Sequence, residues 1–234
     1  MKYNQPLVSI PIPCYEMGGD GVKYLDFCLN KILIQDYPNI EIVISDHSKD
    51  DDVKKSLKKW ETLLNIKYIN NPHKRGSSSA NLNVALQNCT GDLIKIIFQD
   101  DYLLESNSLS TLVTCFNRGN SQWLATACGH SNDRINVFNP HLPKYNDLIA
   151  YGTNTISSPS VIMVKNQDLE LFDENLIWLM DCEYYKRMYD KFGLPIICNY
   201  ITVINFMHAN QVSNTLATTQ VKEDELAYVL KKHS

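Results

Sequence analysis

The sequence lacks a long apolar run, a CxxC cysteine pair and an excess of positive charge. The apolar stretch that begins at Leu7 is short and interrupted by proline, so we expect no signal peptide or membrane anchor. The formal net charge of -4 argues against a general nucleic-acid-binding protein, because such proteins carry a concentrated basic surface. Seven cysteines without paired spacing favour reduced thiols in a cytosolic protein over a disulfide framework.

Internal repeats and low-complexity tracts are also missing, so we expect a single domain over residues 1–234. In the first half, apolar runs alternate with helical patterns. This alternation predicts right-handed βαβ units and a mainly parallel sheet flanked by helices, an α/β fold. The expected strands lie at residues 7–12, 40–45, 66–69 and 93–98, and the expected helices at 22–35, 50–64 and 77–87.

The second half is less regular. We expect strands at residues 161–164 and 195–206, a helix at 181–192 and a tail, 214–234, that becomes helical near residue 221. The tail helix carries Val221, Leu226, Val229 and Leu230. These side chains suit docking on the protein's own core, on a partner subunit in a homodimer, or on a membrane surface.

Polar segments follow the four strands of the first half. In a parallel sheet, ligands bind outside the carboxyl ends of the strands, so these segments should converge on one rim. They are Pro13–Glu16, Asp46–Ser48, Asn70–Gly76 and Gln99–Asp101.

The adjacent acids Asp100 and Asp101 follow the fourth strand. A divalent cation held by carboxylates, with positions left open for phosphate oxygens, would stabilise a departing diphosphate. The alternative is a cluster at the start of a helix over 103–112, where carboxylates favour the positive end of the dipole. The spacing alone does not decide between the two.

Three other acids are equally ambiguous. Asp46 follows the second strand, where it suits either a nucleoside contact or a cap for the next helix. Asp181 and Glu183 begin a helix, and positions two apart face different directions. One of them suits a general base that takes a proton from an acceptor hydroxyl, and the alternative is compensation of the helix dipole. The serines after Gly76 suit a helix cap better than a phosphate cradle.

These segments, in this order, resemble the family 2 glycosyltransferases of the GT-A fold. Val8–Glu16 is similar to the opening strand of the family, and Glu41–Asp50 to its strand-Asp-Asp-Gly-Ser segment. Gly76–Asp92 is similar to its third helix, and Phe98–Asp101 occupies the place of its Asp-x-Asp motif. Phe172–Glu183 and His208–Ser213 are similar to its acceptor-side element and its late histidine loop.

The resemblance implies a nucleotide-binding half over about 1–101 and an acceptor-binding half with a mixed sheet over about 102–213. It implies a catalytic base, Asp181, and a site for Mn²⁺ or Mg²⁺. The nucleotide-binding residues it implies are Pro13, Tyr15, Glu16, Asp46, Ser48, Asn83 and Gln99, and the metal site comprises Asp100, Asp101 and His208. Two departures, Phe98 and Met180, stand where the family often has acids.

The expected reaction is inverting transfer of a sugar from a UDP, dTDP or GDP donor to a hydroxyl of a saccharide or lipid-linked saccharide. Such a transferase would serve surface polysaccharide or glycan synthesis in the cytoplasm, either free or at the inner face of the membrane. One alternative is a nucleotidyltransferase, although the acidic segment Glu16–Asp20 does not suit its basic glycine-rich loop. The other is a nucleotide-sugar-binding protein without catalytic activity, suggested by Phe98 and Met180.

Overall fold

The computed structural model describes residues 5–233. Within this range nine strands form one sheet, accompanied by seven α-helices. The strands are β1 (Val8–Cys14), β2 (Ile40–Asp46), β3 (Ile66–Asn70), β4 (Leu93–Lys95), β5 (Tyr102–Leu103), β6 (Trp123–Ser131), β7 (Phe138–His141), β8 (Ile162–Lys165) and β9 (Ile196–Phe206). The helices are α1 (Gly21–Leu33), α2 (Asp52–Ser56), α3 (Ser78–Gln87), α4 (Ser108–Arg118), α5 (Met180–Phe192), α6 (Val212–Thr215) and α7 (Thr219–Lys232).

The sheet has the order β3-β2-β1-β4-β8-β6-β9-β5, and β7 pairs with β6. In its first half β1 is parallel to β2 and β4, and β2 is parallel to β3. In its second half β8 is antiparallel to β4 and β6, whereas β6 and β9 are parallel. The predicted α/β fold, with a parallel first half and a mixed second half, is confirmed.

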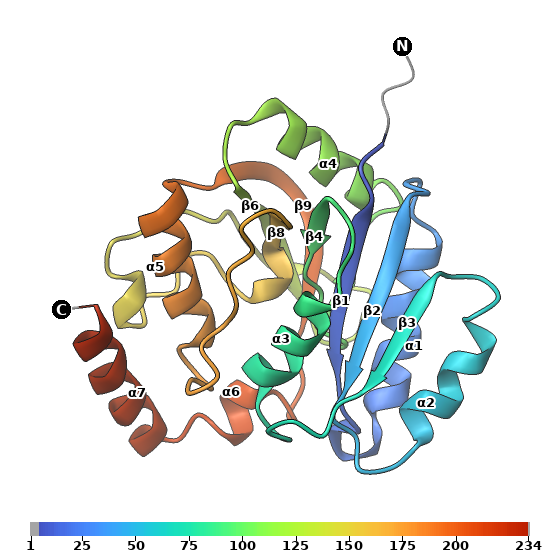
Figure 1. The fold of residues 1–234 in the computed structure, drawn as a ribbon, viewed down its shortest axis with the longest axis horizontal. Coiled ribbons are helices and arrows are strands. Elements are labelled where there is room, and N and C mark those ends of the chain that lie inside the picture. The colour runs from blue at the N-terminus through green and yellow to red at the C-terminus, as the bar shows by residue number, and fades with distance from the viewer. Residues whose placement is uncertain (1–4, 234) are drawn as a thin grey trace.

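Helices cover both faces of the sheet. Figure 1 shows α3 and α5 on the near face and α1 behind the strands. All seven residues of β1 are buried, which explains why its apolar side chains do not alternate with charged ones. The parallel register places Cys14 beside Asp46, and Asp46 beside Asn70. The carboxyl ends of β1, β2 and β3 therefore meet at one edge, the lower edge in Figure 1.

The predicted helix over residues 50–64 is shorter in the structure. The α-helix ends at Ser56, and a 3₁₀ turn, Leu57–Lys59, continues the chain. The Ser56 hydroxyl donates to the carbonyl of Val53 at 2.7 Å. This local bond competes with the α-helical backbone pattern. The apolar side chains at Val53, Leu57 and Trp60 are nevertheless buried, as a helical period requires.

The predicted strand over residues 93–98 ends at Lys95. The buried Lys95 amine donates to the carbonyls of Ile96, Ser160 and Ile162. Beyond it, the N–H of Phe98 donates to the Ser160 hydroxyl rather than to a neighbouring strand. The N–H groups of Ile96 and Ile97 still donate to backbone carbonyls of Ile162 and Pro11. Backbone pairing therefore stops at Phe98, just before the two acids.

The alternative interpretation of Asp100 and Asp101 as the start of a helix is wrong. The residues that follow form β5, which is antiparallel to β9, and α4 begins only at Ser108. The serine-cap interpretation, in contrast, is confirmed, because the Ser77 hydroxyl accepts from the N–H of Ala80 at the start of α3.

The tail of the chain forms α7 (Figure 1), whose Lys232 forms an ion pair with Glu183 of α5. Val229 of this helix is buried in the main core. No helix in the described part of the chain combines the length and apolarity needed to cross a membrane.

Candidate active site

Two cavities open at the edge where β1 to β4 end. The first, of about 440 Å³, is lined by residues that follow β1, β2 and β3, among them Glu16 and Arg75. The second, of about 300 Å³, lies beside the start of α5 and is lined by Ser158 and Asp181, among others. Asp100 lines both cavities. A ligand that occupied both would therefore pass over this carboxylate.

Asp100 lies on the loop between β4 and β5, beside a histidine from the other end of the chain. Its Oδ2 atom lies 2.9 Å from Nε2 of His208, which follows β9. The second ring nitrogen of His208, Nδ1, is buried without a hydrogen-bond partner among residues 5–233. The structure thus brings together two of the three residues predicted to bind a metal.

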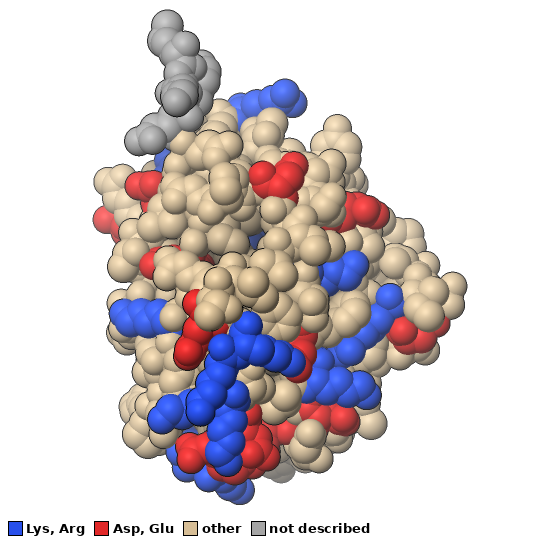
Figure 2. All heavy atoms as spheres, turned by 90° about the vertical axis from the view of Figure 1, so that its right-hand side faces the viewer, with Lys and Arg blue, Asp and Glu red and all other residues tan. Residues whose placement is uncertain are grey.

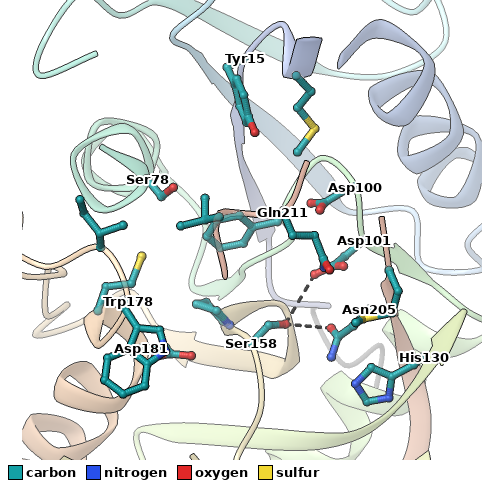
Figure 3. A pocket seen from close by; sticks show the side chains of 17 residues that line it. Tyr15, Ser78, Asp100, Asp101, His130, Ser158, Trp178, Asp181, Asn205 and Gln211 are labelled. Carbon is teal, nitrogen blue, oxygen red and sulfur yellow. Dashed lines mark hydrogen bonds between the residues drawn. The ribbon is translucent and has the colours of Figure 1, made fainter. Parts of the chain in front are cut away.

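Asp101, the third of these residues, is buried but also lines the second cavity. The N–H of Phe206 donates to its Oδ1 atom at 3.0 Å, and the Ser158 hydroxyl donates to Oδ2 at 3.5 Å (Figure 3). Burial, together with the charge of Asp100, raises the pKa of Asp101 above its usual value. Because metal ligands bind in their deprotonated form, this environment favours Asp100 over Asp101 as a ligand.

Asp181 lies in the first turn of α5, across the second cavity from Asp100 and Asp101 (Figure 3). Its carboxylate accepts from the N–H of Cys182 and from the side-chain amide of Asn154, both at 2.7 Å. Burial nevertheless raises the pKa of Asp181 to about 6. A carboxyl group with a pKa near neutrality suits proton transfer at physiological pH.

Glu183, the other acid at the start of this helix, has a structural environment. It is fully buried and forms ion pairs with Arg187 at 2.8 Å and Lys232 at 2.9 Å. These cations hold the pKa of Glu183 below its usual value despite its burial. Of the two candidates, Asp181 is therefore the one that the fold brings to a cavity.

Four of the predicted nucleotide-binding residues line the first cavity: Pro13, Tyr15, Glu16 and Gln99. Gln99 also fixes the loop after β1. Its side-chain amide accepts from the N–H of Tyr15 at 2.6 Å and donates to the Tyr15 carbonyl at 3.0 Å. This pair of bonds places Tyr15 between the two cavities.

Asp46 and Ser48 lie behind the wall of the first cavity, and His47 between them lines it. The Asp46 carboxylate accepts from the N–H of Ser48 and from the hydroxyl of Tyr68, both at 2.8 Å. Asp46 therefore stabilises the loop after β2, and a direct contact with a nucleoside stays a prediction.

Asn83 is not brought to either cavity. Its side-chain amide accepts from the N–H of Phe172 at 2.8 Å and donates to the Phe172 carbonyl at 2.9 Å. A further bond joins it to Glu174 at 3.2 Å. In the structure Asn83 connects α3 to the segment before α5, which is a positioning contact rather than a ligand-binding one.

The basic residues that line the first cavity were not among the predicted site residues. Lys49 and Arg75 line it, and both are exposed. Figure 2 shows that lysine and arginine side chains gather, among acidic ones, toward the lower part of the side that carries β3 and α2. Their positions in the loops that follow β2 and β3 were the available signal. No sequence signal marked Asn154, which orients Asp181 from a distant loop.

The residues at Asp100 fit a hard divalent cation. The Oδ2 atom of Asp100 and the Nε2 atom of His208 lie 2.9 Å apart. The other ring nitrogen of His208, Nδ1, has no hydrogen-bond partner among the described residues. The described residues contain no group of three or more His, Cys, Asp and Glu side chains arranged to hold a metal. Mg²⁺ sites commonly use only one or two protein ligands together with substrate phosphates.

Comparison with known sequences supports the resemblance to family 2 glycosyltransferases. The family model described as Glycosyl transferase family 2 matches residues 9–209. The uncharacterized glycosyltransferase RP339 of Rickettsia prowazekii is 26% identical over 96% of this chain and 72% of its own length. A GalNAc(5)-diNAcBac-PP-undecaprenol beta-1,3-glucosyltransferase of Campylobacter jejuni is 30% identical over 49% of this chain and 36% of its own length.

Two solved structures share the fold. S. aureus TarS in complex with UDP-GlcNAc has a TM-score of 0.73 at 18% identity, covering 97% of this chain and 72% of that one. The mannosyltransferase PcManGT from Pyrobaculum calidifontis, in complex with GDP-Man and Mn²⁺, has a TM-score of 0.65 at 16% identity, covering 99% and 65%. With a family model that spans most of the chain, the protein is a glycosyltransferase and belongs to glycosyl transferase family 2.

Proposed function

We propose that the protein transfers a sugar, with inversion, from a nucleoside diphosphate donor to an acceptor hydroxyl. The observation that carries this proposal is the position of Asp100 and Asp181 on opposite sides of one cavity. The first carboxylate lies where both cavities meet, and the second has a pKa raised to about 6. The nucleotide would occupy the first cavity, and the acceptor would enter the second.

In this proposal Asp181 accepts the proton of the acceptor hydroxyl as that oxygen attacks the anomeric carbon. The bond between the anomeric carbon and the phosphate oxygen breaks, and the nucleoside diphosphate leaves from the opposite face. The side-chain amide of Asn154 donates to the Oδ2 atom of Asp181 and so orients the base. The remaining lone pairs of the Asp181 carboxylate are left for the acceptor hydroxyl. Direct displacement by one nucleophile inverts the configuration of the anomeric carbon.

Asp100 and His208 would hold Mn²⁺ or Mg²⁺ against the diphosphate. When bound, the cation would neutralise the charge that develops on the leaving group. Lys49 and Arg75, which line the first cavity, would attract the dianionic donor. PcManGT carries GDP-Man and Mn²⁺ on the same fold, which supports this assignment.

The proposed acceptor is a saccharide or a lipid-linked saccharide in surface polysaccharide or glycan synthesis. The C. jejuni relative acts on an undecaprenol-linked saccharide, which supports this class. We place the reaction in the cytoplasm or at the inner face of the membrane, where nucleotide sugars are supplied. The donor would be a UDP, dTDP or GDP sugar, since the related folds bind UDP-GlcNAc and GDP-Man.

A donor screen tests the proposal. Thermal unfolding is measured with UDP-GlcNAc, UDP-glucose, dTDP-glucose and GDP-mannose, each with and without Mn²⁺. A ligand that binds the native state raises the melting temperature. Release of the nucleoside diphosphate, with water as the acceptor, is then followed for the donor that stabilises the protein. Stabilisation without release, either to water or to added saccharide acceptors, would indicate the catalytically silent binding protein. Pyrophosphate formation from a nucleoside triphosphate and a sugar-1-phosphate would indicate the nucleotidyltransferase.

A further inference from the structure

Glu225 of α7 places its carboxylate against the chain that enters α5. The N–H groups of three consecutive residues donate to it, from Ile177 at 2.6 Å, Trp178 at 2.9 Å and Leu179 at 2.8 Å. The Glu225 side chain is buried. Hydrogen bonds from N–H groups to an ionised carboxylate are stronger than those between neutral groups. One side chain therefore fixes the backbone of three successive residues.

This carboxylate also lies beside the start of α5. Leu179 is the N-cap residue of α5, and no side chain at that position caps the helix. Because a helix start carries a partial positive charge, a carboxylate beside it is stabilising. Glu225 supplies this charge from a helix far along the chain, whereas Ser77 caps α3 locally.

Other residues of α7 contact the same region. Lys232 forms ion pairs with Asp173 at 2.6 Å and Glu183 at 2.9 Å. Lys222 lies over the ring of Trp178, 5.3 Å from its centroid. Lys222 and Glu225 are three positions apart and so share one face of the helix. The same face of α7 therefore contacts both the ring and the backbone of Trp178.

The fixed segment forms a wall of the second cavity. Ile177, Trp178 and Asp181 all line it, whereas none of them lines the first cavity. Between β8 and α5 the chain forms no helix or strand, so side-chain contacts determine its path. The path of this segment in turn determines where Trp178 and Asp181 stand relative to an acceptor.

We propose that Glu225 is a positioning residue for glycosyl transfer. It holds Trp178 and Asp181 in the wall of the second cavity, so that the acceptor-side chemistry depends on α7 and donor binding does not. This inference rests on the proposed function, in which Asp181 faces the acceptor.

The test compares Glu225→Gln with the wild type and with Asp224→Asn as the matched control. Asp224 is the neighbouring acid on α7, exposed, and its carboxylate accepts a bond from Gln220. Three quantities are measured on folded protein: backbone hydrogen exchange over residues 177–181 without ligand, the Kd of UDP-GlcNAc or of the donor that the screen selects, and the rate of nucleoside diphosphate release to water.

For Glu225→Gln we expect faster exchange over residues 177–181, an unchanged donor Kd and a release rate lower by about tenfold to a hundredfold, as for other small misplacements of reacting groups. Asp224→Asn should match the wild type in all three. A purely structural role would lower only the melting temperature, and a wild-type release rate in folded Glu225→Gln would overturn the proposal.

A second variant covers the case in which Glu225→Gln does not fold. Glu225→Asp keeps the charge but shortens the side chain by one methylene, so that its carboxylate can no longer reach all three N–H groups. Slower release at an unchanged donor Kd supports the positioning role, and a wild-type rate contradicts it. If the wild type releases no nucleotide from any donor, either to water or to added saccharide acceptors, the proposed function fails. Hydrogen exchange in Glu225→Gln then still decides the positioning claim, since an unchanged rate over residues 177–181 overturns it.

Discussion

The Nε2 atom of His208 lies 2.9 Å from the Oδ2 atom of Asp100, although 108 residues separate them in the chain. Their meeting depends on β5, which follows Asp101 directly and pairs with β9 just before His208. The sheet thus brings the late histidine loop to the edge where the first four strands end. A carboxylate and an imidazole at this distance can share one divalent cation with the phosphates of a donor.

His208→Ala should raise the Mn²⁺ concentration needed for half-maximal activity by about tenfold or more, since loss of groups around a metal commonly costs that factor in affinity. Asp100→Asn should raise it further, because the carboxylate supplies the negative charge. The measurement is nucleotide release against Mn²⁺ concentration after removal of metal by chelation. His73→Gln, at an exposed histidine paired with Glu174, is the control. The same Mn²⁺ curve in His208→Ala and wild type would remove His208 from the site.

Asp181 should give the reaction an acidic limb in its pH profile. Burial raises the pKa of Asp181 from 3.8 to about 6, so the group holds its proton below that pH and cannot accept another. We expect kcat to fall about tenfold per pH unit below pH 6 and to be constant above it. The rate of nucleotide release between pH 5 and pH 8 is the measurement. A limb centred near pH 4 would contradict the assignment of Asp181.

Asp181→Asn should keep donor binding and lose transfer by about a hundredfold or more, the usual contribution of a positioned base. The amide fills the same space and can still contact Asn154, so the melting temperature should change little. Calorimetry with the donor and product analysis distinguish the two steps. Full activity in this variant would exclude Asp181 as the base.

Arg75→Ala should weaken donor binding through the loss of one cation in the first cavity. Because Arg75 is exposed and solvent screens its charge, we expect an increase in donor KM of only about fivefold, with kcat retained. The effect should shrink as the salt concentration rises. Lys54→Ala, at an exposed lysine of α2 that does not line the cavity, is the control. Equal donor KM values for the two variants would remove Arg75 from the donor site.

Much of the fold could be predicted from the sequence because local pattern and tertiary packing agree there. The parallel strands β1 and β2 are buried and centred on apolar residues, and Ser77 marks the start of α3. The prediction was wrong where a side chain replaced backbone pairing. The Ser56 hydroxyl bonds to the Val53 carbonyl where the second helix ends, and the Phe98 N–H bonds to the Ser160 hydroxyl where the strand pairing before Asp100 stops.

The candidate site was predictable to the extent that it lies at strand ends. Asp100 follows such an end, and the family resemblance singled out Asp181 and His208. The partners that give these residues their environment come from distant loops and leave no local pattern. Asn154 and Glu225 are examples, because their roles depend on where α5 lies relative to a loop and to α7.

The ionisation of Lys95 tests how strongly the protein interior beneath the site disfavours a charged group. Its amine is buried, and its hydrogen-bond acceptors are backbone carbonyls. Burial lowers the pKa of Lys95 from 10.5 to about 7, although the charge of Asp101 opposes this shift. Between these two pKa values the unfolded chain binds a proton that the native protein does not. Stability should therefore rise with pH in this interval, and be independent of Lys95 ionisation below pH 7.

Lys95→Met should abolish this contribution. From pH 8 to pH 10 we expect the free energy of unfolding of the wild type to gain about 2 to 3 kcal/mol relative to the variant, at 1.36 kcal/mol per pH unit. Urea unfolding of both proteins at the two pH values measures the difference. Lys67→Met, at an exposed lysine of β3, should follow the wild type because its amine is solvated in both states. Parallel curves for wild type and Lys95→Met would show that the Lys95 amine stays charged in the native protein.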